Sequence, residues 1–351
     1  MPLKLTTLKQ VFQAPFDTVI DVRSPAEFAE DHIPGAISLP ALGNEERARI
    51  GTIYTQDTPF KARKIGAALV ARNVAAHLDG PLADKPGGWQ PLVYCWRGGQ
   101  RSGSFASILS QIGWRAQTIE GGYRSYRRLV VQAMHEQTLP HRLILLDGNT
   151  GAAKTELLAL LAARGAQVVD LEHLAAHRGS LFGGVEQPQP SQKAFEGALA
   201  RVLGDLDPSR PVVVETESSK IGSVLIPGSV WRAMRAAPRI QIRAPLAARA
   251  AYLARTYVDL TSGSELLLDR MARLVPFQGH ARVTHWQNLA RDRRFQQLAS
   301  ELMSEHYDRR YDKSRRQADP GQVSELALER LEPDDLEQAA DRLIGMLDRS
   351  G

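Results

Sequence analysis

The chain has 351 residues, of which 43% are hydrophobic and 24% charged, and its formal net charge is +5. This length predicts two domains, and the composition is typical of a soluble globular protein. The single cysteine excludes an internal disulfide framework and fits a reducing, cytoplasmic location. No apolar run is long enough to span a membrane, and the first 16 residues lack the pattern of a signal peptide. The mild positive charge allows a polyanionic partner.

Residues 1–135 show short strand patterns that alternate with helix patterns, which predicts a domain built on a parallel α/β sheet. The β-branched run at residues 18–23 predicts a strand, and the Ser24-Pro25 pair after it marks a helix start. Further strands are predicted at residues 92–94 and 116–120, and each is followed by a glycine-bearing loop and a helix pattern.

The only cysteine, Cys95, stands between an apolar strand and a glycine-bearing loop that opens a helix. Backbone N–H groups of such a loop form an anion site, and the helix dipole adds positive charge there. Arg97 and Arg101 contribute full charges. We therefore expect the Cys95 thiol to ionise readily and act as a nucleophile, with simple packing of a small side chain as the alternative.

Three stretches upstream accompany this loop: Asp21-Val22-Arg23, Glu27-Phe28 and His32-Ile33-Pro34-Gly35-Ala36. Together with the cysteine loop they resemble a rhodanese-like domain, in which the loop cysteine carries sulfur as a persulfide. We expect structural roles for the polar residues Asp21, Arg23, Glu27 and His32. Cys95 and Arg101 also fit the Cys-x5-Arg cradle of cysteine-dependent phosphatases, so sulfur transfer and phosphatase chemistry both remain open at this point.

After a linker at residues 136–141, residues 142–245 predict a second α/β domain that begins with a phosphate-binding loop. A buried-strand pattern leads into Gly148-Asn149-Thr150-Gly151-Ala152-Ala153-Lys154-Thr155 and then into a Leu/Ala-rich helix, as a P-loop requires. The residues expected to bind a diphosphate are Gly148, Thr150, Gly151, Lys154 and Thr155. Ala153 replaces the second glycine of the motif, and its methyl group could narrow the phosphate cradle. A plain strand-to-helix turn is the alternative.

Two further groups of residues belong to this predicted site. The apolar strand at residues 211–214 ends in Glu215-Thr216-Glu217, so Glu215 or Glu217 could hold Mg²⁺ against the diphosphate, while a solvated strand-end acid is an equal alternative. A glycine-bearing turn carries a possible substrate loop, made of His177, Arg178 and Ser180.

Residues 246–351 are mainly helical in pattern, with Arg249 and Arg255 expected to face outward. Basic clusters lie at residues 270–273, 291–294, 309–310 and 313–316, and the aromatic residues among them are Trp286, Tyr307 and Tyr311. Such a mixture suits contact with RNA phosphates and bases, while an ordinary solvated helix face is the alternative. The pattern from residue 333 onward predicts an amphipathic helix that packs on the domain.

The combination of both domains resembles the bacterial tRNA 2-selenouridine synthases. The stretches that carry the resemblance are residues 51–54 (Gly-Thr-Ile-Tyr), the cysteine loop at 95–102, 120–123 (Glu-Gly-Gly-Tyr), the P-loop, 170–183 and 217–222, with a weaker match at 306–311. The resemblance implies a rhodanese-like parallel-sheet domain and a P-loop NTPase-like α/β domain with a helical C-terminal region.

The activity implied by the resemblance is the replacement of sulfur by selenium in 2-thiouridine at wobble position 34 of tRNA. In this family geranyl diphosphate first S-geranylates the base, and selenophosphate then supplies selenium. Cys95 would carry selenium as a selanyl-cysteine, with Arg97 and Arg101 stabilising its anion, and Lys154 would stabilise the leaving diphosphate. No tightly bound cofactor is expected beyond possible Mg²⁺. The alternatives are a cysteine-dependent phosphatase fused to a P-loop kinase and a non-catalytic anion-binding module.

Overall fold

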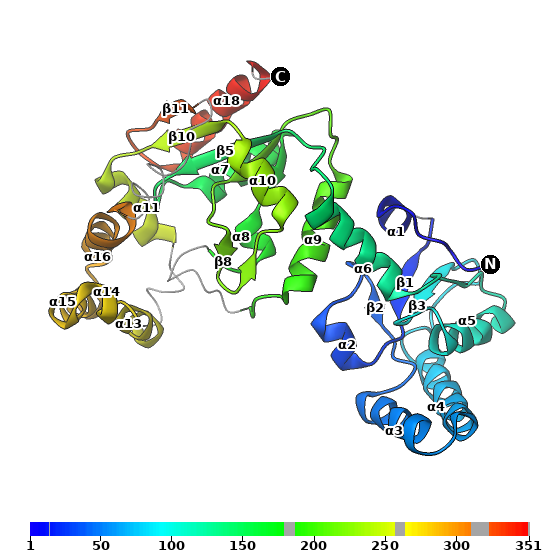
Figure 1. Cartoon of the computed structure of the whole chain (residues 1–351). Coiled ribbons are helices and arrows are strands. Elements are labelled where there is room, and N and C mark those ends of the chain that lie inside the picture. The colour runs from blue at the N-terminus through cyan, green and yellow to red at the C-terminus, as the bar shows by residue number, and fades with distance from the viewer. Residues whose placement is uncertain (14, 179–186, 257–263, 310–322, 350–351) are drawn as a thin grey trace. The chain divides into compact units, whose positions relative to one another are not determined.

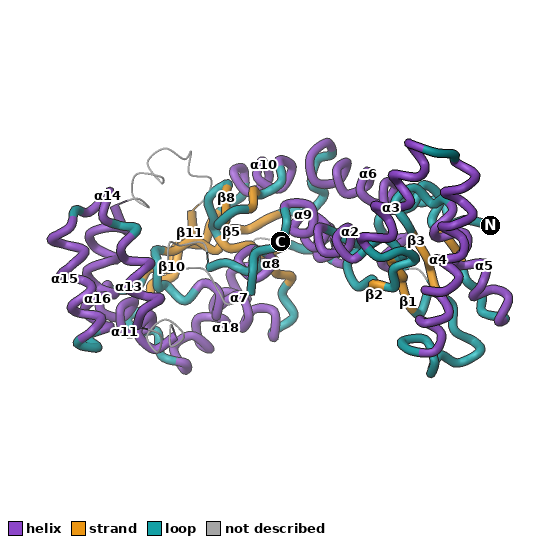
Figure 2. The backbone as a smooth tube through the Cα atoms, turned by 90° about the horizontal axis from the view of Figure 1, so that it is seen from below, coloured by secondary structure: helices purple, strands orange, loops and turns teal. Residues whose placement is uncertain are grey.

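Two units, each built around a parallel sheet, make up this protein. The computed structural model describes residues 1–349 except residue 14 and residues 179–186, 257–263 and 310–322. One unit comprises Met1–Gln137 and Pro190–Asp205, and the other comprises Thr138–Gln189 and Leu206–Gly351. Both sheets carry helices on their faces, which is the α/β architecture that the alternating pattern predicts (Figures 1 and 2).

The sheet of the first unit has the strand order β2-β1-β3-β4, and all its pairings are parallel. Its strands are β1 (Thr18–Asp21), β2 (Ile37–Ser38), β3 (Pro91–Tyr94) and β4 (Gln117–Thr118). Its helices are α1 (Lys9–Phe12), α2 (Pro25–Glu30), α3 (Asn44–Gln56), α4 (Pro59–Asp79), α5 (Gln100–Ile112), α6 (Tyr123–Val131) and α9 (Gln192–Asp205), with a π-helical turn (Gln132–Glu136) after α6. All four residues of β3 are buried, because a central parallel strand is covered on both faces.

Helix α9 lies far along the chain but belongs to the first unit. The sequence analysis assigned residues 142–245 to the second domain, whereas in the structure this helix packs on α6. Its Glu196 side chain is buried and pairs with Arg127, and His135 Nε2 lies 3.0 Å from Glu196 Oε1. These contacts to the buried Glu196 carboxylate hold the helix on the first unit.

The second unit contains a five-stranded parallel sheet of order β11-β10-β5-β7-β6. Its strands are β5 (Leu143–Gly148), β6 (Gln167–Val169), β7 (Val212–Glu215), β10 (Arg239–Arg243) and β11 (Val323–Ala327), and a separate antiparallel hairpin is formed by β8 (Lys220–Ile221) and β9 (Val224–Leu225). Its helices are α7 (Lys154–Ala163), α8 (Leu171–Leu174), α10 (Gly228–Ala236), α11 (Leu246–Thr256), α13 (Ser264–Ala272), α14 (Val275–Gln278), α15 (His280–Arg291), α16 (Phe295–Leu302) and α18 (Pro333–Arg349), with a π-helical turn (Met303–Tyr307) after α16.

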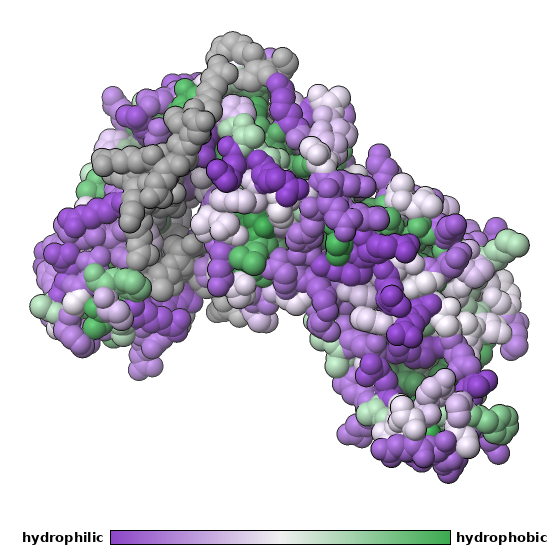
Figure 3. Space-filling view, in the orientation of Figure 1, coloured by the Kyte–Doolittle hydropathy of each residue, from purple (hydrophilic) through white to green (hydrophobic). Residues whose placement is uncertain are grey.

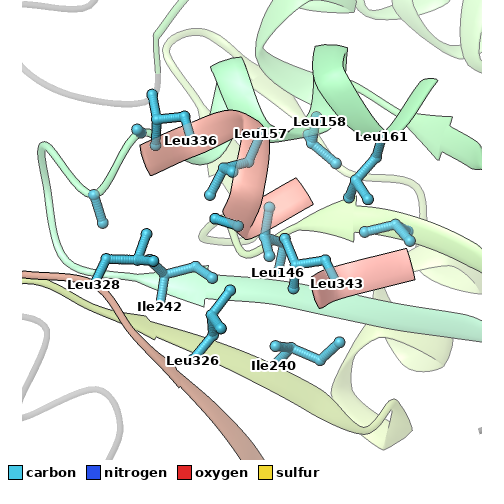
Figure 4. Packing of buried hydrophobic residues seen from close by; sticks show 14 of the residues in the cluster. Leu146, Leu157, Leu158, Leu161, Ile240, Ile242, Leu326, Leu328, Leu336 and Leu343 are labelled. Atoms are coloured by element: carbon cyan, nitrogen blue, oxygen red, sulfur yellow. The ribbon is translucent and has the colours of Figure 1, made fainter. Parts of the chain in front are cut away.

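The core of this unit joins the sheet to α7 and to the C-terminal helix α18 (Figure 4). Leu157 and Leu161 from α7 meet Leu336 and Leu343 from α18, and Ile242 from β10 extends the same cluster. The predicted amphipathic helix at the C-terminus therefore packs on the domain through its apolar side, as expected.

Strand β11 and the buried side chain of Trp286 differ from what the sequence predicted for residues 246–351. Residues 323–327 form β11, which extends the sheet beside β10, although only Leu326 of this short strand is buried. Trp286 is 1% exposed in a separate cluster of α13, α15 and α16, and its Nε1 donates to Glu301 Oε2 at 3.0 Å. Packing therefore uses this indole, which is not available for base stacking.

The surface is mainly hydrophilic on the face shown in Figure 3, as the composition of a globular protein predicts. Hydrophilic side chains cover most of this face, and hydrophobic ones form small patches. Among the helices that the structure describes, none is both long and apolar enough to cross a membrane.

Candidate functional site

The cysteine loop is held by close backbone packing against the turn before α6. The Tyr123 N–H donates to the Cys95 carbonyl oxygen at 2.8 Å. Gly98 and Gly122 have positive φ angles of 66° and 58°. A Cβ atom on Gly122 would lie 2.2 Å from the Cys95 oxygen, and one on Gly98 would lie 2.5 Å from the Ile119 oxygen. Only glycine fits both places, so this contact fixes the shape of the loop.

The Cys95 thiol is buried, with 3% of the residue exposed. Its Sγ lies 3.2 Å from Ser102 Oγ, which in turn lies 3.3 Å from the Gly99 carbonyl oxygen. Burial opposes ionisation, but hydrogen bonds from Ser102 and from backbone N–H groups, together with the charge of Arg101, leave the pKa of Cys95 below its ordinary value. The loop therefore makes the thiolate, which is the form that acts as a nucleophile, easier to form than at an ordinary cysteine.

The two arginines predicted to stabilise the thiolate have different environments. Arg101 is half-buried, and its Nη1 donates to Glu27 Oε2 at 2.8 Å, while Arg47 Nε lies 3.1 Å from the same oxygen. Arg97 is exposed. Arg101 thus acts on Cys95 through its charge while its guanidinium is anchored by Glu27.

A buried polar cluster around Arg23 packs against Tyr123, whose N–H holds the cysteine loop. Arg23 is 1% exposed, and its Nη2 donates to Asp21 Oδ2 at 2.6 Å and to the Asp31 carbonyl at 2.5 Å. Its guanidinium also lies 4.1 Å from the centre of the Tyr123 ring. The Tyr94 hydroxyl donates to Asp21 at 2.8 Å. These contacts match the structural roles expected for Asp21 and Arg23.

The aromatic side chains of His32 and Trp96 both pack against other rings. His32 Nδ1 lies 2.9 Å from the Phe28 carbonyl, and its ring stacks on Phe28 with 3.8 Å between centroids. Trp96 stacks on Tyr123 with 5.2 Å between centroids.

In the second unit, β5 leads into the phosphate loop and α7 leads out of it. Gly151 has a φ of 80°, and a Cβ there would lie 3.0 Å from the Arg249 carbonyl. A Cβ on Gly148 would lie 3.0 Å from Ala152 Cβ. Lys154 begins α7, and its Nζ donates to the Gly148 carbonyl at 2.9 Å. The lysine, the loop and the helix N-terminus are therefore brought together, as an anion site requires.

Ala153, the departure from the P-loop motif, packs into the hydrophobic core of the second unit. Its backbone is left-handed, with φ 58° and ψ 27°, and the residue is 4% exposed within the hydrophobic core. The methyl group therefore packs among apolar side chains. The cost is a strained backbone, about 1–3 kcal/mol for a residue other than glycine.

Three glutamates gather beside Lys154. Glu215, at the end of β7, is fully buried, and its Oε1 accepts from the Glu172 N–H at 2.8 Å. The carboxyl groups of Glu172 and Glu217 share a hydrogen bond. The hydroxyl of Thr155 donates to Glu172 Oε2 at 3.3 Å.

Burial and mutual repulsion keep these acids partly protonated. Burial, followed by the charge of Glu217, raises the pKa of Glu172 to about 8. Burial and the charge of Glu215 raise the pKa of Glu217 to about 7. Burial also raises the pKa of Glu215 well above its ordinary value. Lys154 opposes all three shifts, so a further cation would favour ionisation.

The predicted Mg²⁺ ligands can be tested against these contacts. Within the described ranges, no group of three or more His, Cys, Asp or Glu side chains is arranged to hold a metal ion. Glu215 Oε2 is nevertheless a buried carboxylate oxygen with no hydrogen-bond partner in the structure. Carboxylate oxygens are the donors that Mg²⁺ prefers, so the chemistry of this set fits the ion. The magnesium site stays a prediction.

Sequence reasoning missed a polar contact that holds the phosphate loop. Arg249 is 6% exposed rather than outward-facing, and its Nη1 donates to the Thr150 carbonyl at 3.0 Å. Its Nη2 pairs with Asp308 Oδ2 at 2.8 Å, and Asn149 Nδ2 donates to Asp308 Oδ1 at 3.1 Å. The weak match at residues 306–311 was the only signal in the sequence that pointed to Asp308.

The possible substrate loop is only partly described. The His177 N–H donates to the Glu172 carbonyl at 3.0 Å, which places the start of this loop beside the acidic group. Burial, then the charge of Arg270, lowers the pKa of His177. Arg178 follows it in the chain and is half-buried. Ser180 lies outside the described residues, as do Tyr311 and the basic cluster at 313–316.

Comparison with known proteins places both loops in recognised domains. A rhodanese-like domain model matches residues 5–129, and a model described as the tRNA 2-selenouridine synthase AAA domain matches residues 141–266. Curated relatives named tRNA 2-selenouridine synthase include one from Nitrosomonas europaea, 37% identical over 69% of this chain and 64% of its own length. Another, from Bdellovibrio bacteriovorus, is 36% identical over 70% of this chain and 66% of its own length. The match thus covers just under two thirds of these relatives.

One solved structure also matches in part. It is described as the N-terminal domain of an ATP/GTP binding protein from Clostridium difficile 630, and it is 32% identical over 37% of this chain and 99% of that domain. Its TM-score of 0.33 supports no conclusion.

Replacing Ser102 tests the origin of the thiolate. We expect Ser102→Ala to raise the pKa of Cys95, because the variant loses the hydroxyl beside Sγ while burial remains. Thiolate ultraviolet absorbance followed against pH measures this directly, since Cys95 is the only cysteine. Ser104→Ala, an exposed change on the same helix, is the control. An unchanged titration in Ser102→Ala would contradict this account.

The acidic group should make stability depend on pH. Glu172 and Glu217 hold protons in the folded protein that the unfolded chain has already released, so their contribution is lost as pH rises from about 5 to about 8. We expect the wild-type melting temperature to fall over this range more than that of Glu217→Gln, in which one acid and its repulsion are removed. Glu329→Gln, at an exposed site, is the control. Parallel melting curves for all three proteins would refute the assignment.

Proposed function

We propose that this chain, which belongs to the tRNA 2-selenouridine synthase family by its rhodanese-like and AAA domains, replaces sulfur by selenium in 2-thiouridine at wobble position 34 of tRNA. The observation that carries the proposal is the pairing, in one chain, of a thiolate-stabilising loop with a lysine-bearing phosphate loop. One loop suits chemistry at a chalcogen, and the other suits a diphosphate.

The first step is geranyl transfer at the phosphate loop. The sulfur of 2-thiouridine attacks the carbon that bears the diphosphate, the carbon–oxygen bond breaks, and the base loses its N3 proton. Lys154, the loop N–H groups and the N-terminus of α7 stabilise the departing diphosphate. If Mg²⁺ participates, Glu215 or Glu217 would hold it, and the ion would neutralise diphosphate charge.

The second step is selenation at the cysteine loop. A thiocarbonyl sulfur leaves poorly, whereas the S-geranylated sulfur leaves readily as a thiolate. Selenophosphate is the selenium source. Loading Cys95 as a selanyl-cysteine breaks the selenium–phosphorus bond, releases phosphate to water and passes two electrons to an external disulfide oxidant. The terminal selenium then attacks C2 of the base, geranylthiolate leaves, and external thiols cleave the S–Se bond and regenerate Cys95. The loop N–H groups and the charge of Arg101 support its anion, and Arg97 is an exposed cation on the same loop.

Cys95→Ser should abolish selenation while leaving geranylation intact, because it removes the selenium carrier and leaves the second unit unchanged. The measurement is nucleoside mass spectrometry of thiolated tRNA incubated with protein, geranyl diphosphate and selenophosphate, with each donor omitted in turn. Ser107→Ala, at an exposed position of α5, is the matched control. Undiminished 2-selenouridine from Cys95→Ser would remove this residue from the mechanism, and phosphate release from small phosphoesters without tRNA would favour a phosphatase instead.

Lys154→Ala should impair geranyl transfer, because the diphosphate loses its charged partner. The same assay, run without selenophosphate, should show S-geranyl-2-thiouridine reduced by roughly a hundredfold or more. Lys9→Ala, at an exposed lysine of the first unit, controls for the loss of one positive charge. Normal geranylation by Lys154→Ala would exclude the phosphate loop from this step.

A further inference from the structure

A groove in the first unit lies beside the cysteine loop and has no role in the steps above. It has a volume of about 580 Å³ and runs between α3, α4 and the start of α5. Apolar side chains line much of it, including Ile50, Tyr54, Ala62 and Val70. This volume lies within the range of about 300–1,000 Å³ that is usual for small-molecule sites, which are mostly apolar with a few polar groups.

Two helical glycines line the groove, Gly51 on α3 and Gly66 on α4. A Cβ on Gly51 would meet nothing within 4 Å, and one on Gly66 would only approach Ile50 at 3.9 Å. Glycine inside a helix costs about 1 kcal/mol relative to alanine, and neither glycine is needed for close packing here. The space they leave is therefore available to a ligand.

The rim of the groove is basic. Arg47, Arg63 and Arg101 line it, and Arg47 and Arg101 share the single carboxylate of Glu27. Arg63 is exposed. The rim therefore keeps an excess of positive charge, and an apolar floor beneath such a rim suits an apolar group attached to a polyanion.

Some residues that line the groove are close in sequence to Cys95. Gln100 and Arg101, in the first turn of α5, line it, and Ser102 in the same turn lies beside Cys95 Sγ. Arg101 thus faces the groove and also lowers the pKa of Cys95. A chain lying in the groove would have its attachment point near the loop that holds the thiol.

We propose that this groove binds the geranyl chain that S-geranyl-2-thiouridine carries, and so positions the wobble base for selenation at the Cys95 loop. The inference rests on the proposed function for the identity of the chain. It commits to the chain on the RNA rather than to free geranyl diphosphate, because the groove borders the α5 turn that places Ser102 beside Cys95 Sγ, and this thiol acts after alkylation. It also gives a role to the Gly51–Tyr54 stretch, which the two-step mechanism leaves without one.

The experiment fills the groove in the full-length protein. The probes are anticodon stem-loop RNAs that carry either S-geranyl-2-thiouridine or 2-thiouridine, and the readout is Kd by fluorescence anisotropy. Wild type should bind the geranylated RNA roughly tenfold more tightly, from burial of the chain. Gly51→Leu should lose this preference and keep its affinity for the thiolated RNA. Tyr54→Ala, at a side chain that is 56% exposed, should weaken the preference without affecting folding.

The matched control is Gly345→Leu, the same change at a glycine of α18 where a Cβ also meets nothing within 4 Å. It should behave like wild type. Equal affinities of wild type for the two RNAs, or a preference retained in Gly51→Leu, would overturn the proposal. Binding of free geranyl diphosphate that Gly51→Leu abolishes, with no preference between the RNAs, would also overturn it and assign the groove to the donor.

The same RNAs separate this inference from the proposed function. Conversion of the thiolated RNA to selenouridine by a wild-type protein that shows no binding preference would refute the groove alone. A clear preference in a protein that makes no selenouridine with both donors present would refute the proposed function and leave the groove as a binding site.

Discussion

Burial of one guanidinium supports the first unit and its reactive loop. Arg23 is almost inaccessible to water and lies among Asp21, the Asp31 carbonyl and the Tyr123 ring. Removing a charge from water costs several kcal/mol, so the arrangement is stable only when every donor has a partner. Tyr123 also supplies the N–H that holds the Cys95 carbonyl. The position of the thiol therefore depends on a network that no part of the reaction touches.

The two loops use burial in opposite directions. At Cys95, hydrogen-bond donors and a cation outweigh the cost of burial, so the group loses its proton more easily. At Glu172, Glu215 and Glu217, three acids stand near one lysine, and burial wins, so protons are retained. Burial thus accompanies a lowered cysteine pKa in one unit and raised glutamate pKa values in the other, because the neighbouring charges and hydrogen bonds differ. A cation arriving with a diphosphate would find oxygens able to ionise toward it.

The sequence predicted those features that depend on local pattern. Strands with continuous apolar runs, the helix start at Ser24-Pro25 and the helix after the phosphate loop all agree with the structure. Features that depend on partners distant in the chain were missed. Strand β11 has one buried side chain and forms because β10 offers it an edge, and Arg249 is drawn inward by Asp308. Ala153 was judged by a motif, whereas its conformation is set by the core around it.

The contact between Arg249 and Asp308 has a thermodynamic consequence. Asp308 holds Asn149 through one oxygen and Arg249 through both, and Arg249 holds the Thr150 carbonyl, so the phosphate loop and the end of the helical region form one hydrogen-bonded unit. A partner that engaged Asp308 would compete with Asn149 and with the Arg249 guanidinium for its two oxygens. Linkage makes such an effect reciprocal. If the partner changes the affinity of the loop for its ligand, the bound ligand changes the affinity for the partner by the same factor. Binding of a diphosphate at the loop and binding of a macromolecule by these helices would thus be coupled through the Asp308 carboxylate.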